Sequence, residues 1–314
     1  MNQLQTPVTF IVFNRPEPTR RVFAAIAAAR PSRLLIIADG PRADRKGESQ
    51  LCDEVRKIVS DVHWPCKVET NFSEENLGCR RRVISGLDWV FSLVEEAIIL
   101  EDDCLPNPTF FPYCAELLER YRDCEQIAII GGFNPLQESF PFPYSYYFTR
   151  LVLIWGWATW RRTWQNYDEH MTLWPEVKKG ELLKLMWKAR KPRKQWTSIF
   201  DSNYKGVGPN SWDYQLIYSL WVRNFLNIVP RRNLIQNIGF GEEATHTKRA
   251  DPGFKIESQD LSFPITHPPA VMDWPDYAKT YQDRFYTPSL WGRIFRKIGF
   301  LLNHPFPARR RKIS

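Results

Sequence analysis

The chain has 314 residues, of which 43% are hydrophobic and 25% charged, and these values are those of ordinary globular proteins. No segment approaches the roughly 18 uninterrupted apolar residues that a membrane span needs, and residues 1–13 lack the basic start and cleavage site of a signal peptide. The six cysteines form no CxxC pair, which argues against a zinc site or a disulfide framework. We therefore predict a cytoplasmic protein.

The net charge of +8 predicts an anionic partner. Three classes fit that charge: a nucleotide diphosphate, a membrane surface and nucleic acid, of which nucleic acid is the one we do not expect. The 13 Trp and 24 Pro are unusually numerous and indicate an aromatic-lined, loop-rich second half. Aromatic walls suit sugars, although they also suit protein cores.

Short apolar runs recur early in the chain, separated by segments long enough for helices. This alternation predicts βαβ units and a parallel sheet, hence an α/β fold. One intervening segment, residues 83–94, repeats apolar residues at helical spacing, and another helix is predicted to begin at Asn107, followed by Pro108. The four predicted strands are Val8–Phe13, Leu34–Ala38, Lys67–Thr70 and Ala97–Leu100.

Beyond Phe133 the alternation fades into Pro- and aromatic-rich sequence, which includes a strongly basic helical segment at Leu182–Lys194. We predict a nucleotide-sugar-binding half over residues 1–135 and an acceptor-binding, catalytic half of the same domain over residues 136–260. Residues 261–314 form an extension. Its apolar and basic residues, Leu290–Leu302, can form an amphipathic helix on the inner face of an anionic membrane, or simply a docking helix.

The run Ala97–Leu100 stops abruptly on Glu101, Asp102 and Asp103. Ligands of open parallel sheets bind at the carboxyl ends of the strands. Three adjacent carboxylates repel one another unless a cation or solvent screens them, and oxygen ligands favour Mg²⁺ or Mn²⁺. A divalent cation holding a diphosphate is therefore one interpretation, and a solvated acidic turn before Pro106 is the other.

Glu101–Asp103 and the following segment, Cys104–Phe111, resemble the DXD-type region of A-type-fold glycosyltransferases, specifically relatives of protein N-acetylglucosaminyltransferase I. The resemblance extends over roughly residues 7–250. It implies a Rossmann-like nucleotide-diphospho-sugar transferase fold with a mixed, mainly parallel sheet. It also implies that Asp103 ligates the Mn²⁺ or Mg²⁺ ion, while Asp102 and Glu101 contact the ribose and neighbouring groups of a nucleotide-sugar.

Four further candidates for the nucleotide-sugar site follow the same resemblance. Arg15, after the first strand, is expected at the uridine or diphosphate, where a guanidinium can donate paired hydrogen bonds. Asp39, after the second, is expected to accept from the base. Gly78 and Arg80 lie in a loop that relatives close over the nucleotide. Each has an alternative: a surface arginine, an ordinary Asp-Gly turn, and a charged helix face for the arginines at 80–82.

The second half contributes three more candidates. Trp157, in a tryptophan-rich segment, resembles the stretch beneath the donor sugar, although core packing is the commoner role for such a residue. Asp213, in a Trp-Asp motif, resembles the carboxylate beside the acceptor hydroxyl and is our predicted general base; otherwise it is a helix N-cap. His246 is predicted to reach the pyrophosphate as a second metal ligand, or else to be structural.

Together these residues predict a metal-dependent glycosyltransferase that moves a sugar from a nucleotide-sugar, such as UDP-N-acetylglucosamine, to a hydroxyl of a carbohydrate, lipid-linked or protein acceptor, with inversion. A nucleotidyltransferase on a related fold is the first alternative, but it needs a Gly-rich, Lys-bearing phosphate loop, which Asn14-Arg15-Pro16 does not offer. A non-catalytic protein that binds an anionic polymer is the second.

Overall fold

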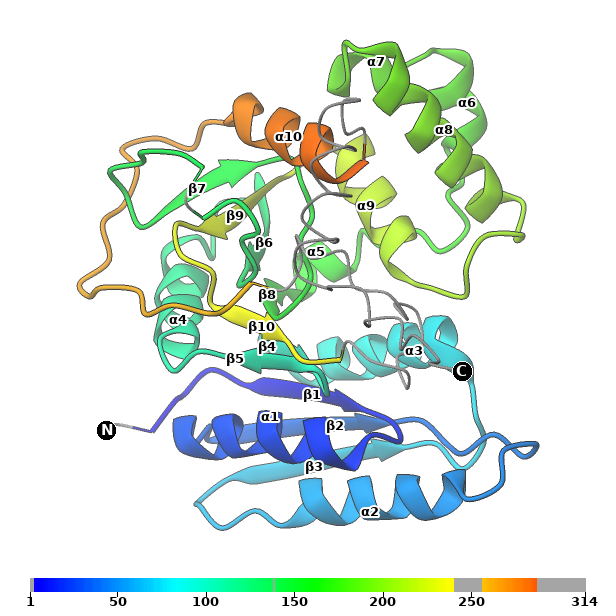
Figure 1. Cartoon of the computed structure of the whole chain (residues 1–314), viewed down its shortest axis with the longest axis vertical. Helices are drawn as coiled ribbons and strands as arrows, with labels where there is room; N and C mark the ends of the chain where they lie inside the picture. Colours follow the sequence, from blue (N-terminus) through cyan, green and yellow to red (C-terminus); the bar gives the residue numbers. More distant parts are fainter. Residues whose placement is uncertain (1–2, 138, 240–255, 287–314) are drawn as a thin grey trace, which may run out of the picture.

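Over residues 3–137, 139–239 and 256–286, which the computed structural model describes, the strands form an eight-stranded sheet and a two-stranded sheet (Figure 1). The large sheet has the order β3-β2-β1-β4-β8-β6-β9-β7, and β5 pairs with β10. The strands are β1 (Val8–Val12), β2 (Arg33–Ala38), β3 (Lys67–Phe72), β4 (Glu96–Glu101), β5 (Cys104–Pro106), β6 (Ile127–Gly131), β7 (Tyr146–Thr149), β8 (Trp157–Trp160), β9 (Leu226–Pro230) and β10 (Ile235–Asn237).

The predicted α/β class with a mixed, mainly parallel sheet is confirmed. The first four strands of the large sheet, β3-β2-β1-β4, are all parallel, and β6 and β9 are parallel as well. The remaining pairs, β4 with β8, β8 with β6 and β9 with β7, are antiparallel. Because the four parallel strands share one direction, their carboxyl ends lie along one edge of the sheet.

Helices cover both faces of this sheet. Side chains alternate along β1, so that Val8, Phe10 and Val12 pack with α1, α2 and α4, whereas Ile11 packs with α3 and α9. The helices are α1 (Pro16–Ala29), α2 (Glu48–Ser60), α3 (Gly78–Leu93), α4 (Phe110–Arg120), α5 (Arg161–Trp164), α6 (Trp174–Lys179), α7 (Leu183–Met186), α8 (Arg190–Tyr204), α9 (Asp213–Val222) and α10 (Pro275–Tyr281), followed by a π-helical turn at Gln282–Tyr286.

We predicted Asn107 as the N-cap residue of α4 and Pro108 as its first helical residue, so the predicted start is wrong by two residues. The helix begins at Phe110, with Thr109 as its N-cap residue. Asn107 Oδ1 instead accepts from the backbone N–H of Thr109 at 2.9 Å, and Asn107 Nδ2 donates to Asp260 at 2.9 Å. Asn107 therefore stabilises the turn before the helix and ties it to a distant segment, rather than capping the helix itself.

Helices α6, α7 and α8 form a helical unit that stands away from the sheet. Helix α9 lies between this unit and the sheet (Figure 1). Its interior is a separate aromatic cluster that includes Trp174, Trp196 and Phe200. The single basic helix predicted over Leu182–Lys194 is wrong, because the backbone is extended at Trp187 and again before α8 begins at Arg190. The buried indole of Trp187 accounts for this break, since it turns the chain inward.

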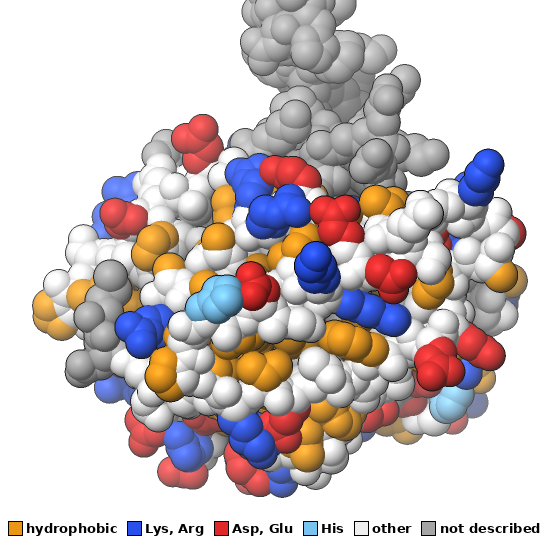
Figure 2. Space-filling view, turned by 90° about the horizontal axis from the view of Figure 1, so that it is seen from below, with side chains coloured by type: hydrophobic (Ala, Val, Ile, Leu, Met, Phe, Trp, Pro, Cys, Tyr) orange, Lys and Arg blue, Asp and Glu red, His pale blue; other side chains and the backbone are white. Residues whose placement is uncertain are grey.

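The end of the molecule opposite the helical unit carries charged side chains of both signs (Figure 2). Figure 2 views the molecule from the side of α2 and the edge strand β3, and basic and acidic side chains are mixed over that face.

All six cysteines are free thiols. Within the described part of the chain, no helix combines the length and apolar character that crossing a membrane requires. The amphipathic helix predicted over Leu290–Leu302 lies outside the described residues.

Candidate functional site

A pocket of about 380 Å³ opens where the parallel strands β1, β2 and β4 end. Ligands of parallel sheets bind at this edge. The segment after β10 and the loop before α9 close the other side, so both halves of the chain contribute. The pocket is lined by Ile11, Val12, Phe13, Arg15, Asp39, Arg42, Asn76, Gly78, Cys79, Arg82, Val83, Glu101, Asp102, Asp103, Trp155, Asn210, Asn237 and Gly239.

The three predicted carboxylates, Glu101, Asp102 and Asp103, all line this pocket. Asp102 is buried, whereas Glu101 and Asp103 are half-buried. Burial, followed by the charges of Asp103 and Asp102, raises the pKa of Glu101 to about 8. Burial also raises the pKa of Asp102 to about 6, although Arg15 opposes the shift. Because burial leaves these charges poorly screened by solvent, the cluster binds protons more readily than isolated carboxylates do.

Arg15 lies in the pocket as predicted, but its guanidinium faces the carboxylates. Nε donates to Asp102 at 3.2 Å, Nη2 forms an ion pair with Asp102, and Nη1 donates to Asp103 at 3.0 Å. Burial works against the charged form of Arg15, but Asp102 and Asp103 raise its pKa above the ordinary value. These contacts use three of its five N–H donors, which leaves two for a ligand.

Asp39 lies at the end of β2, as predicted, but its carboxylate is already fully hydrogen-bonded. Oδ1 accepts from the backbone N–H groups of Gly40 and Leu77, both at 2.9 Å. Oδ2 accepts from Gly78 N at 3.0 Å and from Asn76 Nδ2 at 3.2 Å. These four bonds fill the acceptor capacity of a carboxylate. Asp39 therefore fastens the loop before α3 to the sheet, and its predicted contact with a base stays a prediction.

Gly78 begins α3 and has a left-handed backbone with φ of 75°, which glycine adopts at low cost. A Cβ atom at this position would lie 2.8 Å from Nδ2 of Asn210. The absence of a side chain at Gly78 therefore brings α3 against the loop that precedes α9, and the predicted approach of this backbone to a nucleotide stays a prediction. Asn210 is a lining residue that the sequence analysis missed.

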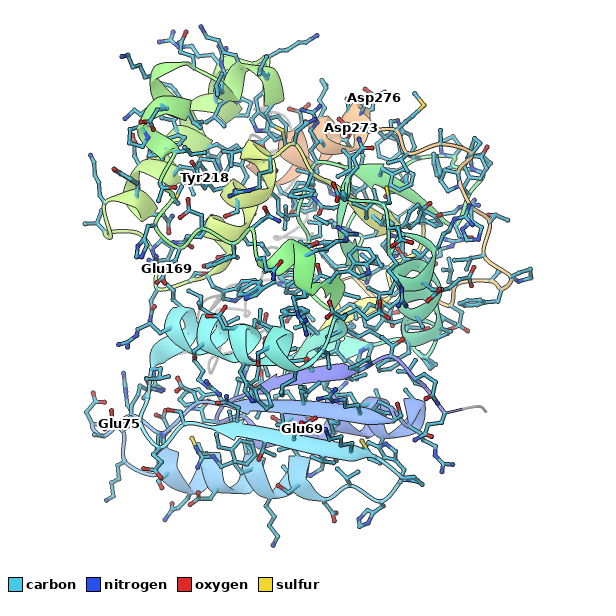
Figure 3. The ribbon with its side chains drawn as sticks, turned by 180° about the vertical axis from the view of Figure 1, so that it is seen from behind. Glu69, Glu75, Glu169, Tyr218, Asp273 and Asp276 are labelled. Carbon is cyan, nitrogen blue, oxygen red and sulfur yellow. The ribbon has the colours of Figure 1, made fainter. Side chains whose placement is uncertain are left out.

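Arg80 does not line the pocket, so its predicted place at the nucleotide is corrected. Its Nη2 donates to the carbonyl oxygen of Glu169 at 3.0 Å, and Nε lies 3.4 Å from the carboxylate of that residue. Figure 3 shows Glu169 beside the amino-terminal end of α3. Besides Arg15, the arginines that line the pocket are Arg42 and Arg82. Helical spacing could have indicated Arg82, because it shares the buried face of α3 with Gly86 and Val90.

Trp157 is a core residue, so the predicted contact with the donor sugar is corrected as well. It is 1% exposed, and its ring stacks on Trp212 with the centroids 5.8 Å apart. Trp155, two residues earlier, is half-buried and lines the pocket beside Phe133, with ring centroids 4.5 Å apart. The sequence signalled a tryptophan cluster but not which member faces the pocket.

Asp213 is the first residue of α9, and the N-cap position belongs to Trp212. Its carboxylate accepts a hydrogen bond from Ser211 Oγ. The charge of Asp213 is among those that raise the pKa of Glu101, after burial and the neighbouring aspartates, and it acts in the same way on Cys79. Asp213 therefore lies close enough for its charge to act on Glu101, although it does not line the pocket and is 110 residues away from Asp103 in the sequence.

The segment after β10 packs on Asp103. The backbone N–H of Ile238 donates to the carbonyl oxygen of Asp103 at 2.8 Å, because β10 pairs with β5. A Cβ atom at Gly239 would lie only 2.2 Å from Asp103 Oδ2, so glycine is required there. The sequence analysis missed Asn237 and Gly239. The predicted ligand His246, and the neighbouring Glu242 and Glu243, lie outside the described residues.

No protein-family model and no curated protein matches the chain. The solved structures that match it include UDP-glucose pyrophosphorylase complexed with UDP-glucose, at 12% sequence identity and a TM-score of 0.25. That match covers 47% of this chain and 64% of the other, which is less than two thirds of the pyrophosphorylase chain. A likeness this weak supports no inference about activity, and the resemblance to protein N-acetylglucosaminyltransferase I stays a prediction.

Proposed function

We propose that the chain is a glycosyltransferase that takes a sugar from a nucleotide-sugar, in particular a UDP-sugar, and transfers it to an acceptor hydroxyl. One observation carries the proposal: three carboxylates, Arg15 and Asn210, from the loop before α9, line one pocket at the carboxyl ends of parallel strands. The pocket is large enough for a small-molecule ligand. It joins a site for an anionic leaving group to a carboxylate that can receive a proton.

The reaction needs two kinds of assistance. The bond from the anomeric carbon to the diphosphate breaks, and the negative charge left on the diphosphate must be stabilised. Arg15 supplies positive charge there through the two N–H donors that its carboxylate partners leave unused. As the acceptor oxygen bonds to the anomeric carbon from the opposite face, its proton passes to the carboxylate of Asp213. That geometry inverts the anomeric carbon.

A divalent cation fits the oxygen donors of this pocket. Within residues 3–137, 139–239 and 256–286, no group of three or more His, Cys, Asp or Glu side chains is arranged to hold a metal by itself. Mg²⁺ and Mn²⁺ do not need such a cage, because they usually take one or two carboxylates together with substrate phosphates and water. Asp103 would hold the ion, which when bound acts as a Lewis acid that neutralises the diphosphate.

The proposal is tested by two measurements on the purified chain. Calorimetry with UDP should show binding that Mn²⁺ strengthens, and a panel of nucleotide-sugars should include one that is slowly hydrolysed without an acceptor. A parallel assay supplies UTP and sugar 1-phosphates, because a nucleotidyltransferase would join them and release pyrophosphate. UDP binding with neither hydrolysis nor transfer, or product only in the parallel assay, would contradict glycosyl transfer.

A further inference from the structure

A second and larger hollow lies in the helical unit. It is a groove of about 840 Å³ between α6, α7 and α8. Of its lining residues, six are basic and two acidic, so the charges sum to +4. The basic residues are Lys178, Lys184, Arg190, Arg193, Lys194 and Lys205. A cleft lined by one sign of charge concentrates ions of the opposite sign, so the groove attracts anions.

The acidic side chains of the groove are already neutralised. Asp201 pairs with Lys178 at 2.8 Å, and Glu181 pairs with Lys184. The other four cations, Arg190, Arg193, Lys194 and Lys205, form no ion pair with any described residue. Because these four cations have no ion-pair partner among the described residues, their positive charge is available to an anionic ligand and does not link the helices to one another.

Hydroxyl groups stand among these cations. One face of α8 turns toward the groove and carries Thr197, Ser198 and Ser202 between Lys194 and Lys205. Lys194, Ser198, Ser202 and Lys205 are three or four residues apart, which places them in a row along the helix. The opposite face of the same helix packs into the aromatic cluster of the unit. The groove therefore combines positive charge with hydroxyl donors and acceptors along its length.

The groove leads toward the pocket at the carboxylate cluster. Lys205 and Val207 line the groove, and Asn210 lines the pocket. The three residue-to-residue steps from Val207 to Asn210 can span at most about 11 Å. Helix α9 follows and begins at Asp213, the proposed base. A chain lying in the groove can thus extend toward the place where a hydroxyl would react.

We propose that this groove binds the acceptor as an anionic carbohydrate chain, carrying carboxylate or phosphate groups, whose end reaches the pocket; this rests on the proposed glycosyl transfer. Guanidinium groups pair with carboxylates and phosphates, and the hydroxyls match sugar hydroxyls. Single-stranded nucleic acid would need exposed rings for base stacking, whereas the one aromatic ring lining the groove, Trp174, is 1% exposed. A bilayer is flat and does not fill a hollow.

The test compares two variants that each lose four positive charges. The groove variant combines Arg190→Gln, Arg193→Gln, Lys194→Gln and Lys205→Gln. The control variant combines Arg45→Gln, Lys46→Gln, Lys57→Gln and Arg231→Gln, which are exposed, lie outside the groove and form no ion pair with described residues. The probes are a galacturonate hexamer, a neutral glucose hexamer and vesicles containing phosphatidylglycerol.

We expect the wild type to bind the galacturonate hexamer and not the neutral one. The groove variant should bind it about 10–100-fold more weakly, because each exposed charge contributes a small amount, while the control variant should lose little. Equal loss in both variants, or equal binding of the two hexamers, would overturn the proposal. Binding to the vesicles alone would also overturn the proposal. The vesicles are included because Leu182 and Leu185, on the same helical unit, are exposed.

Nucleotide binding separates this inference from the proposed function. UDP with Mn²⁺ should bind the groove variant as it binds the wild type, because none of the four substitutions lines the pocket. If UDP does not bind the wild type but the hexamer does, glycosyl transfer fails while the groove stands as an anion-binding site. If UDP binds but the hexamer binds neither wild type nor variant, the groove proposal fails alone.

Discussion

The pocket and the groove are opposites built from one chain. The pocket takes its carboxylates from the end of a strand, and its interior arginine, Arg15, is already paired with them. The groove takes its cations from the surfaces of helices and leaves four without an ion pair to any described residue. The net charge of +8 is therefore a poor guide to where an anion binds. The pocket that we propose for the nucleotide contains a cluster of three carboxylates, whose charge a cation or Arg15 must offset.

The largest expected effect is on the rate of sugar transfer, and it separates catalysis from ligand binding. Asp213→Asn keeps the shape of the side chain but removes a carboxylate that can take a proton at neutral pH. Transfer should slow by roughly 10²–10⁴-fold, whereas UDP affinity and binding of the galacturonate hexamer should stay unchanged. Asp276→Asn is the control, since Asp276 lies in the first turn of α10 and is exposed. Near wild-type turnover in Asp213→Asn would reduce Asp213 to a structural residue.

The two tryptophans of the pocket region should differ in what they support. Trp157→Ala removes a fully buried ring and should lower the free energy of unfolding by about 3–5 kcal/mol, measured by urea denaturation. Trp155→Ala removes a half-buried ring, so it should cost less stability and weaken binding of the nucleotide-sugar instead. The assignment of Trp157 to the core would be contradicted if the Trp155 variant proved the less stable of the two.

Removing one carboxylate tests whether the pocket depends on a cation. In Asp103→Ala, Mn²⁺ should no longer strengthen UDP binding, because the proposed ligand is lost. Asp53→Ala, which removes an exposed carboxylate on α2, should leave the Mn²⁺ effect intact. Calorimetry with and without Mn²⁺ gives the answer. An unchanged Mn²⁺ effect in the Asp103 variant would mean that the protein does not hold the ion there.

A smaller difference between the pocket and the groove is expected in how strongly salt weakens ligand binding. Raising ionic strength from about 0.05 to 0.2 M shortens the range of exposed charges, so binding of the galacturonate hexamer to the groove should weaken several-fold. UDP binding in the pocket should change less, because Asp102 is buried and Arg15 largely so. Titrations at both salt concentrations test this prediction. Equal salt dependence at the two sites would contradict the predicted difference between the groove and the pocket.

Much of the site could be predicted because it depends on strand ends. Glu101, Asp102 and Asp103 follow a buried run, and Arg15 follows another, so a parallel sheet brings them together without further information. The errors occur where a cluster offered several candidates. Arg80 was favoured over Arg82, but only the contact with Glu169, 89 residues away, shows that Arg80 turns aside.

The same limit applies to residues whose role is set by packing. An aspartate at a strand end has the same local sequence whether it binds a ligand or, like Asp39, accepts hydrogen bonds from its neighbour Gly40 and from a distant loop, the one before α3. Trp155 and Trp157 belong to one cluster, and the stacking of Trp157 on Trp212 decides which of them is buried. Local patterns do not contain these distant partners.

The amino-acid sequence is enough to predict the α/β class, the parallel first half and the gathering of charged residues at one edge of the sheet. These follow from the spacing of apolar residues and from chain direction, which are local properties. The folded chain was needed to show that Arg15 pairs with the carboxylates, that Gly239 packs on Asp103, and that four cations of the helical unit face one groove. Such contacts join residues far apart in the chain, and their geometry depends on how whole elements pack against one another.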